Sequence, residues 1–580
     1  MAEPDGSRPV RVANCSGFYG DRLAAAREMV DGGPIDVLTG DYLAELTMLI
    51  LWRTRLKHPE GGYATTFLRQ LDDILGTCLD RGIRIVTNAG GLNPAGCAEA
   101  VRGIAHRLGL DAKVAHIEGD DLLARIPDLQ AAGHDLANLD TGEPLAARGV
   151  EPVTANAYLG GWGIAAALGA GADIVVCPRV TDAALVVGPA AWWHGWARDD
   201  WDRLAGAVVA GHVLECGAQA TGGNYAFFTE IDDLSHPGFP LAEVAGDGSC
   251  VVTKHPDTAG AVSIGTVTAQ LLYEIAGPAY ANPDVVARFD TIALTDDGPD
   301  RVRISGARGQ PAPPTTKVCI NYLGGFRNSS TFVLTGLDLE PKESLVRETL
   351  FQAVGGQQVY DEVAVTTTPT DDGALLRVTV KDAEEAKVGR AFSNAAIELA
   401  LASYPGFYLT APPSGASPYG VYWPALVPAG EVGHTVVLDH GERIDIEPVD
   451  APTFTVDVAA PAAPSPPAGP TRRAPLGLVV GARSGDKGGN ANVGLWARTD
   501  EAWAWLDAAV TVEVFKELLP EAGPLEVRRY DLANLRALNF VVVGLLGEGV
   551  ASSTRFDAQA KALGEQLRAA ELEIPVALLA

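Results

Sequence analysis

Basic residues are scarce in this chain of 580 residues, in which 44 lysines and arginines stand against 73 aspartates and glutamates and the formal net charge is -29. So much negative charge repels phosphate backbones and anionic membranes outside local basic patches. Long apolar runs are lacking too, since none reaches the roughly 20 residues that span a bilayer. Residues 1–9 lack the basic start and apolar core of a signal peptide. We therefore expect a cytoplasmic protein with no nucleic-acid partner and no membrane partner.

Clustered cysteines and histidines are also missing from the sequence. The seven cysteines stand singly without a Cys-x-x-Cys pair, and the ten histidines show no His-Glu-x-x-His spacing. This pattern fits reduced thiols and argues against a disulfide framework or a zinc ribbon. A P-loop is disfavoured because Lys487 is followed by Gly488. Residues 161–166 match Gly-x-Gly-x-x-Ala, but they precede their strand, so we interpret them as close helix packing.

The first part of the chain alternates short β-branched segments with Ala- and Leu-rich segments. Hydrophobic residues make up 47% of the chain and charged ones 20%, enough apolar surface for sizeable cores. The pattern predicts strands at Val10–Cys15, Ile35–Thr39, Ile83–Asn88, Lys113–Ile117 and Asp173–Cys177, with helices that begin near Asp21, Tyr42, Thr65, Pro94 and Asn156. Such alternation predicts an α/β fold with parallel βαβ units and helices covering the sheet.

Each of the predicted strands ends in polar residues. In parallel α/β folds the carboxyl ends of the strands share one edge, where ligands bind. We expect Asp41 and Asp182 to act there as acid/base groups, and the substrate to be oriented by Asn14, Ser16, Asn88, Asn93 and Arg179. The alternative is that the aspartates are only helix caps.

A second chemically loaded stretch runs from His212 to Tyr225. It offers His212 or Glu215 as a base and Cys216 as a thiol, followed by a glycine turn. These are components of an acid/base or thioester site, and we include Cys216 among the substrate-binding candidates. Against this interpretation, a lone buried cysteine is usually a small hydrophobic residue.

Composition divides the rest of the chain. We predict one large domain over residues 1–458, with the site-bearing α/β part at about 8–280 and a second α/β subdomain at about 281–458. Residues 459–471 are almost wholly Pro, Ala, Ser and Gly, which predicts a semi-rigid linker. Residues 472–580 then form a small α+β domain whose element order resembles a split β-α-β sandwich.

The polar residues of that small domain gather at residues 483–492, where three glycines are interspersed with donors. The candidate ligand-binding residues are Arg483, Ser484, Asp486, Lys487, Asn490 and Asn492. Glycines let the backbone approach a ligand, and the side chains can hold an anionic or carbonyl-bearing group. The alternative is a tight hairpin in which Asp486 pairs with its basic neighbours.

These motifs together resemble a known family. The stretches at residues 14–22, 39–43 and 88–94, with Arg483–Gly488, Asn490 and Asn492, are similar to the acyclic terpene utilisation AtuA family. The resemblance covers nearly the whole chain and implies a large N-terminal domain with a small ferredoxin-like C-terminal domain. Members are associated with degradation of acyclic terpenes and leucine-like branched acids, whose intermediates are coenzyme A thioesters processed beside biotin-dependent carboxylases.

The resemblance implies a pathway, and the chemistry rests on the residues. Our leading hypothesis is a hydratase or dehydratase acting on a branched acyl-CoA or related carbonyl substrate. Such chemistry needs a group that moves a proton next to the thioester and donors that hold the enolate-like oxygen. It requires no cofactor beyond coenzyme A as part of the substrate. We also expect a homo-oligomer.

Two alternatives remain open at this level. The chain could be a non-catalytic subunit that binds acyl-CoA or associates with acyl-CoA carboxylase subunits. Alternatively, the carboxylates at the strand ends could bind a divalent metal, because carboxylate oxygens suit magnesium or manganese.

Overall fold

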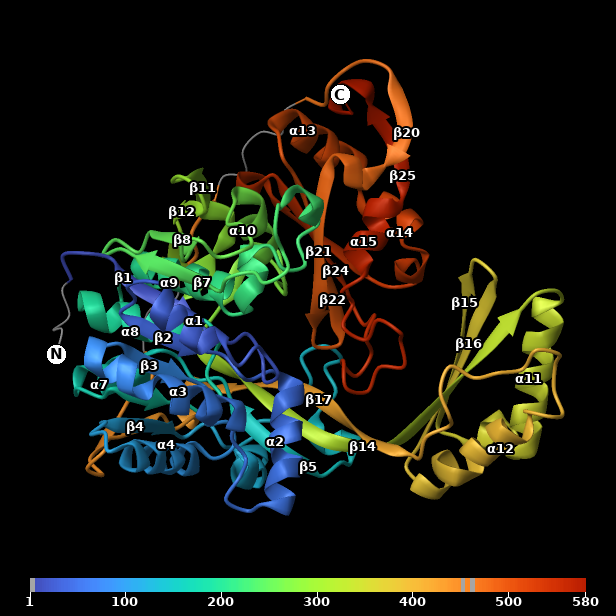
Figure 1. Cartoon of the computed structure of the whole chain (residues 1–580), viewed down its shortest axis with the longest axis horizontal. Coiled ribbons are helices and arrows are strands. Elements are labelled where there is room, and N and C mark those ends of the chain that lie inside the picture. The colour runs from blue at the N-terminus through green and yellow to red at the C-terminus, as the bar shows by residue number, and fades with distance from the viewer. Residues whose placement is uncertain (1–5, 450–453, 459–464, 580) are drawn as a thin grey trace. The chain divides into compact units, whose positions relative to one another are not determined.

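The computed structural model describes residues 6–449, 454–458 and 465–579 (Figure 1). The chain divides into two compact units. The first comprises Met1–Ile320, Trp423–Gly547 and Gln559–Ala580, and the second comprises Asn321–Tyr422 and Glu548–Ala558. The small C-terminal domain therefore belongs almost entirely to the first unit.

A parallel sheet forms the centre of the first unit. Its strands stand in the order β1 (Val10–Asn14), β2 (Val37–Gly40), β3 (Arg84–Thr87), β6 (Ile174–Val176) and β4 (Val114–Glu118), and each neighbouring pair is parallel. These are the five strands predicted from the sequence. Their carboxyl ends consequently lie along one edge of the sheet.

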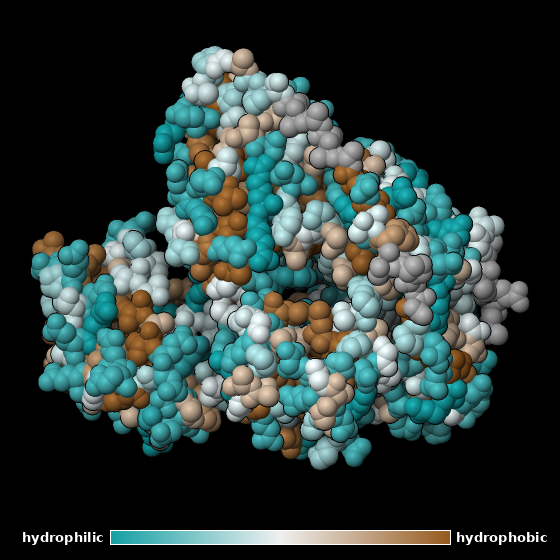
Figure 2. Space-filling model, turned by 180° about the vertical axis from the view of Figure 1, so that it is seen from behind, coloured by the Kyte–Doolittle hydropathy of each residue, from teal (hydrophilic) through white to brown (hydrophobic). Residues whose placement is uncertain are grey.

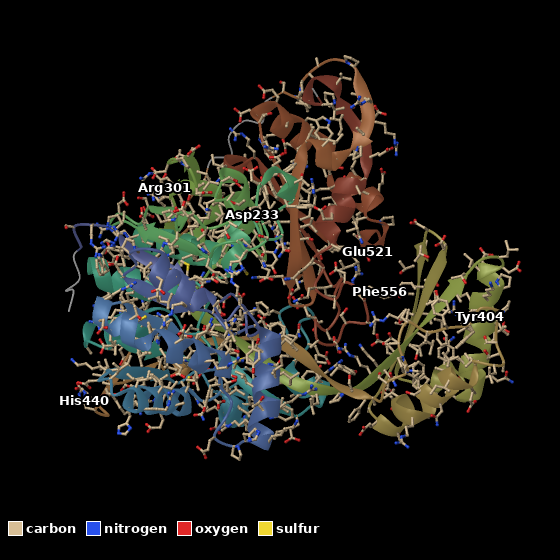
Figure 3. The ribbon with its side chains drawn as sticks, viewed as in Figure 1. Asp233, Arg301, Tyr404, His440, Glu521 and Phe556 are labelled. Atoms are coloured by element: carbon tan, nitrogen blue, oxygen red, sulfur yellow. The ribbon has the colours of Figure 1, made fainter. Side chains whose placement is uncertain are left out.

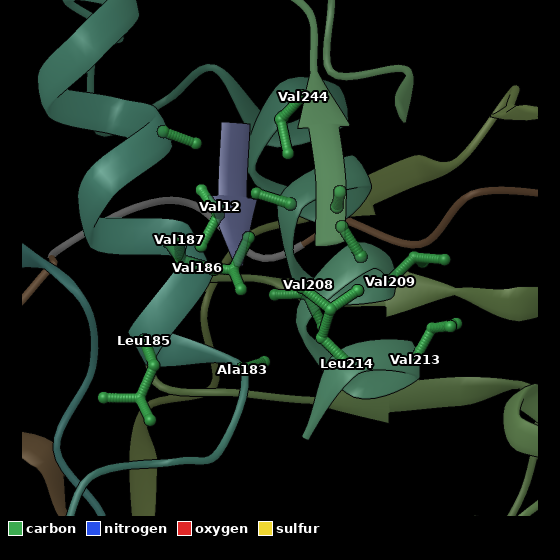
Figure 4. Close-up of a cluster of buried hydrophobic side chains, with 14 of the residues drawn as sticks. Val12, Ala183, Leu185, Val186, Val187, Val208, Val209, Val213, Leu214 and Val244 are labelled. Carbon is green, nitrogen blue, oxygen red and sulfur yellow. The ribbon is translucent and has the colours of Figure 1, made fainter. Parts of the chain in front are cut away.

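Helices cover both faces of this sheet. One face carries α1 (Ala25–Gly32), α3 (Thr65–Arg81) and α4 (Pro94–Leu108), and the other carries α7 (Trp162–Gly169), α8 (Ala184–His194) and α9 (Trp201–Leu214). Successive strand residues alternate between the two cores, so that Val12 packs against α8 and α9 (Figure 4) while Ala13 faces the opposite cluster. The α/β class predicted from the sequence is confirmed.

Antiparallel strands extend the sheet on both sides. Beside β1 lie β7 (Pro240–Val244), β8 (Cys250–Lys254), β12 (Arg301–Ser305) and β11 (Ala293–Asp296), and beside β4 lie β18 (Thr435–Val437) and β19 (Arg443–Asp445). Arg301 of β12 (Figure 3) pairs with Glu243 of β7 and with Asp297. Residues 293–305, which the sequence pattern assigned to a second subdomain, thus belong to the first sheet because β12 pairs with β8.

One predicted helix start is wrong. Residues around Asn156 form β5 (Pro152–Ala157), and α7 begins only at Trp162. The backbone of this segment is held extended because the Ala157 and Tyr158 amides donate to the Asp120 and Lys317 carbonyls. The glycine pattern at 161–166 packs helices closely, since a Cβ on Gly188 of α8 would lie 2.7 Å from the Gly161 carbonyl oxygen.

Smaller elements complete this part of the chain. They are α2 (Glu45–Lys57), α5 (Ile126–Ala131), α6 (Leu145–Arg148), α10 (Ile264–Leu271) and a three-stranded sheet of β13 (Arg308–Gln310), β10 (Val286–Arg288) and β9 (Ala279–Ala281). Helix α2 begins only a few residues after β2, and therefore at the carboxyl edge of the sheet.

The second unit is built on long antiparallel strands. Its elements are β14 (Thr315–Thr335), β15 (Glu362–Thr370), β16 (Gly373–Asp382), β17 (Ser417–Pro428), α11 (Leu339–Ala353) and α12 (Phe392–Glu398), with β14 and β17 each also contributing residues to the first unit. Phe332, Leu376 and Phe392 lie in its core. Tyr404 (Figure 3) fastens the core by donating its hydroxyl proton to the Val333 carbonyl at 2.8 Å.

The C-terminal domain is an antiparallel α+β unit. The strands β21 (Val480–Lys487), β22 (Asn490–Ala497), β24 (Ala537–Val542) and β23 (Val527–Leu532) form its sheet, and β20 (Thr471–Pro475) pairs with β25 (Glu571–Pro575). Its helices are α13 (Asp500–Ala509), α14 (Val512–Leu518) and α15 (Leu563–Ala569). The sequence predicted a strand at residues 476–480, but the observed strand β21 begins only at Val480. Of the predicted linker at 459–471, residues 459–464 lie outside the described residues.

The surface agrees with the composition. Hydrophilic residues cover most of the face shown in Figure 2, and hydrophobic residues appear on it as separate patches. Within the described ranges, no helix has both the length and the apolar character needed to cross a membrane.

Candidate acid/base site

Asp41 lies directly after β2 at the carboxyl edge of the sheet. Its Oδ1 atom accepts hydrogen bonds from the Asn88 side chain at 2.6 Å and from the Leu43 backbone amide at 3.0 Å. Burial and the nearby charge of Asp182 raise the pKa of Asp41 well above its usual value, although Arg179 and Asn88 oppose the shift. Because Oδ1 is occupied by two donors, Oδ2 is the atom that can carry the proton.

Arg179 connects the end of β6 to this carboxyl group. Its guanidinium donates to Asp182 Oδ1 at 3.2 Å and to the Leu43 carbonyl at 3.1 Å, and it lies 4.3 Å from the centre of the Tyr158 ring. Burial opposes its charge, but Asp182, Tyr158 and Glu45 raise the pKa of Arg179, so the group stays a cation. Asp182 is thereby held by a fixed positive charge while its side chain remains 31% exposed.

Glu215 and His212 lie at the end of α9. Burial and the charges of Asp182, Glu274 and Asp41 raise the pKa of Glu215 well above its ordinary value. Glu215 Oε2 is buried and accepts no hydrogen bond from any described residue. Burial and Lys487 lower the pKa of His212 to about 3. At neutral pH the imidazole is therefore neutral, and the proton of the pair is on the carboxyl group.

The stretch 483–492 is a β-hairpin, the alternative to a ligand-binding turn that the sequence left open. Arg483 pairs with Gly494 and Lys487 pairs with Asn490, so the donors lie on strands β21 and β22 with a tip at Gly488–Gly489. Asp486 forms no ion pair with a basic neighbour in the hairpin among the described contacts. Instead, burial and the charges of Glu274 and Glu45 raise the pKa of Asp486 to about 8.

The hairpin brings a cation to the edge of the large domain. Lys487 Nζ lies 5.5 Å from the centre of the Tyr280 ring, and the Tyr280 and His212 rings are tilted against each other with their centres 5.1 Å apart. The charge of Lys487 acts on Glu215, Glu274 and His212, since it lowers the pKa that each would otherwise have. The small domain thus supplies the positive group opposite the carboxyl groups of its own chain.

Other polar residues of the hairpin fasten the two domains together. The Asn492 side chain donates to the Leu272 carbonyl at 2.9 Å and accepts from the Glu274 amide at 2.8 Å. Asn490 donates to Asp140, whose carboxylate also accepts from the Gly489 amide. Arg483 donates to Gln219 and stacks on Tyr273.

Ser484 has a role within the small domain. Its hydroxyl donates to the Lys561 carbonyl and accepts from the Gly564 amide, both at 3.0 Å. It therefore holds the start of α15 against β21.

The strand-end asparagines also have assigned contacts. Asn14 donates to the Leu214 and Glu215 carbonyls and so fixes the backbone that carries Glu215. Asn88 accepts from the Tyr42 amide while donating to Asp41. Both residues position the carboxyl groups. Asn93 instead caps α4 by accepting from the Gly96 amide, a role that the sequence analysis considered only for the aspartates.

Ser16 and Cys216 lie beside the same edge. The Ser16 hydroxyl donates to the Phe18 carbonyl, and the Ser16 backbone amide donates to Asn14 Oδ1, both at 3.1 Å. Burial, Glu215 and Glu274 raise the pKa of Cys216 well above the ordinary thiol value. A protonated thiol is a poor nucleophile, so the thioester role considered for Cys216 is not favoured.

Several charged residues of the site carried no recognisable motif. Glu45, the first residue of α2, accepts a hydrogen bond from the Tyr158 hydroxyl at 2.7 Å and lies 3.8 Å from Lys317 Nζ. Burial would raise the pKa of Glu45, but Lys317 and Arg179 outweigh it and lower the value to about 2. Burial raises the pKa of Glu274, against the effects of Tyr273 and Lys487. Among these residues, only Glu45 could have been suspected from the sequence, because it lies four residues after Asp41.

No three His, Cys, Asp or Glu side chains of the described residues are arranged so that they could hold a metal ion. Cations accompany individual carboxyl groups of the site: Arg179 pairs with Asp182, Lys317 lies 3.8 Å from Glu45, and the charge of Lys487 acts on Glu215.

Fold and site together define a two-domain α/β protein with protonated carboxyl groups and cations at the carboxyl edge of a parallel sheet. A model described as acyclic terpene utilisation family protein AtuA matches residues 10–438, and a model of the AtuA ferredoxin-like domain matches residues 474–573. Since the first match spans well over half of the chain, this protein belongs to the acyclic terpene utilisation AtuA family. Searches of curated proteins and of solved structures returned no match.

Proposed function

We propose that this protein is an acid/base lyase that adds water to, or removes water from, a branched acyclic acyl-CoA or related carbonyl compound. The observation that carries the proposal is a buried Glu215, whose pKa burial and the nearby charge of Asp182 raise, beside an Asp182 held by Arg179 at the same edge of the sheet. General acid and base groups of this kind need different protonation states at the same pH.

In the dehydration direction, Asp182 accepts the proton next to the substrate carbonyl. Negative charge then develops on the carbonyl oxygen, and Arg179 or Lys487 stabilises it as a preformed cation. Glu215 donates its proton to the departing hydroxyl group, which leaves as water. Transfer of the proton from Asp182 to Glu215 restores the starting state, and hydration follows the same steps in reverse.

Neighbouring residues keep these groups in the required states. Burial and the charge of Asp182 make ionisation of Glu215 unfavourable, so that its carboxyl group keeps its proton at neutral pH. His212 stays neutral and close to Glu215 Oε1, where it can orient the carboxyl group. Asn14 and Asn88 fix the backbone and the carboxyl group to which they bond.

The experiment uses the full-length protein and a panel of branched acyclic acyl-CoA thioesters. Mass spectrometry reports gain or loss of one water, and NMR in D₂O reports exchange of the proton next to the carbonyl. We expect both changes with at least one thioester, and their loss in the Asp182→Asn and Glu215→Gln variants. Binding of the thioesters without exchange or hydration would contradict the lyase and support a non-catalytic binding subunit.

A further inference from the structure

A cavity that is open to the surface lies along the same edge of the sheet, outside the carboxyl site. Its volume is about 390 Å³, which is within the size range of small-molecule pockets. Six of its ten lining residues are apolar, namely Trp52, Leu56, Pro59, Leu92, Leu123 and Val153. The other four lining residues are Arg55, Asp121, Thr154 and Asn156. Apolar side chains therefore form most of the wall, and they suit an aliphatic chain.

The elements that form this cavity also form the acid/base site. Helix α2 contributes Trp52 and Leu56 to the cavity, and its first residue is Glu45 of the site. Leu92 follows β3 in the loop after Asn88, and Leu123 is the first residue of the short 3-10 helix that follows β4 and Asp120. Cavity and site thus occupy neighbouring loops at the carboxyl ends of the strands.

A line of hydrogen bonds connects the cavity wall to the site. Asn156, which lines the cavity, donates to Asp120 Oδ2 at 2.7 Å. The same oxygen accepts from the Arg179 backbone amide at 3.3 Å, and the Arg179 side chain holds Asp182. A ligand that fills the cavity therefore lies against the residues that position the reacting groups.

The cavity wall reaches the surface at α2. Leu56, which lines the cavity, is 66% exposed. An apolar side chain exposed at the rim of a pocket is a common feature of ligand entrances.

We propose that this cavity binds the aliphatic chain of the substrate, while the carbonyl end of the same molecule lies at the Asp182–Glu215 site. The inference rests on the proposed function for the identity of the reacting end. The cavity sets the selectivity for chain length, because a longer chain buries more apolar surface along Trp52, Leu123 and Val153.

The test separates binding in the cavity from catalysis. A ten-carbon aliphatic chain with a carboxyl head and a terminal diazirine is cross-linked to the full-length protein by light, and labelled peptides are mapped by mass spectrometry. We expect labelling of residues 52–59, 92, 123 and 153. The Leu123→Trp substitution, which fills the cavity, should reduce this labelling at least tenfold. Leu478→Trp, at a site 60% exposed on the C-terminal domain, is the matched control and should not change it.

A kinetic arm follows once a substrate is known. Leu123→Trp should raise KM at least tenfold for long-chain thioesters and leave short-chain thioesters within twofold. Val153→Ala, which enlarges the cavity, should instead lower KM for thioesters with bulkier chains. This variant replaces Leu123→Trp as the test if Leu123→Trp fails to fold. Labelling elsewhere in the chain, or labelling unchanged in both variants, would overturn the proposal even if lyase activity is found. Cavity labelling without any water addition would uphold it while overturning the proposed function.

Discussion

His212 Nδ1 lies 3.5 Å from Glu215 Oε1, with both side chains buried at the end of α9. In water such a pair would form an ion pair near neutral pH. Here burial and Lys487 lower the pKa of His212, and burial with three neighbouring carboxyl groups raises the pKa of Glu215. The proton therefore resides on the carboxyl group, which makes Glu215 the natural acid of the site.

The first prediction concerns stability and pH. The folded protein binds a proton at Glu215 that the unfolded chain, with a pKa of about 4.3, has lost by neutral pH. Folding stability consequently falls as the pH rises above that value towards the raised pKa of the folded state. The free energy of unfolding, measured by urea denaturation, should fall between pH 5 and pH 8. This fall should be smaller for Glu215→Gln than for the wild type, by about 1.4 kcal/mol or more. Equal losses in both proteins would refute the protonated state, and Glu442→Gln at the surface is the control.

The second prediction concerns catalysis. Asp182→Asn removes the proposed base but keeps the size and the hydrogen-bonding capacity of the side chain towards Arg179. We expect kcat to fall by about 10² to 10⁴, the usual contribution of a positioned base, with KM changed much less. Steady-state kinetics on the thioester panel measures this. Asp233→Asn, in an exposed loop (Figure 3), should retain wild-type rates. A wild-type kcat in Asp182→Asn would show that another residue is the base.

The third prediction concerns the hairpin cation. Lys487→Met removes the charge that holds down the pKa of Glu215. If protonated Glu215 is the acid, activity is lost as the pH rises through its pKa. The alkaline limb of the pH–rate profile should therefore shift to higher pH in the variant. Loss of a cation that holds the substrate oxygen should also raise KM about tenfold or more. The pH dependence of kcat and KM tests both effects, with Lys516→Met on α14 as the control. If neither the alkaline limb nor KM changes in Lys487→Met, Lys487 is not part of the site.

The fourth prediction concerns the attachment of the small domain. Asn492 is fully buried, and its amide bonds to Leu272, Glu274 and Asn539. Asn492→Ala leaves buried backbone groups without partners, at a cost of about 1–3 kcal/mol for each such group. We expect a loss of about 2–4 kcal/mol in urea denaturation, whereas Asn394→Ala on the exposed side of α12 should be nearly neutral. A change below about 0.5 kcal/mol would argue against this interdomain contact.

The fifth prediction concerns the thiol next to the acid. Because the pKa of Cys216 is raised, its thiol stays protonated at neutral pH and reacts slowly with alkylating agents. Iodoacetamide at pH 7.5 should leave Cys216 unlabelled in the folded protein and label it after denaturation. Cys216→Ala should keep activity within about threefold. Rapid inactivation that maps to Cys216 would restore a nucleophilic role.

Local sequence pattern was sufficient for the five parallel strands, because β-branched segments separated by Ala- and Leu-rich helices have few other ways to bury their apolar faces. The same pattern placed Asp41, Arg179 and Asp182 at the ends of those strands, and the edge they share follows from parallel topology. It did not reveal the strand at Asn156, whose extended backbone depends on hydrogen bonds to Asp120 and Lys317. Nor did it decide between a ligand-binding turn and a hairpin for Arg483–Asn492, since glycines and polar residues are common in both.

The assembly of the site depended on contacts between distant parts of the chain. Glu45, Glu274 and Lys317 carry no motif, and each becomes part of the site only because separate loops of the same edge meet there. The protonation states of Glu215 and His212 likewise arise from burial and from Lys487, which lies more than 250 positions further along the chain. A residue's type is written in the sequence, whereas its solvation and its neighbouring charges exist only once the chain has folded.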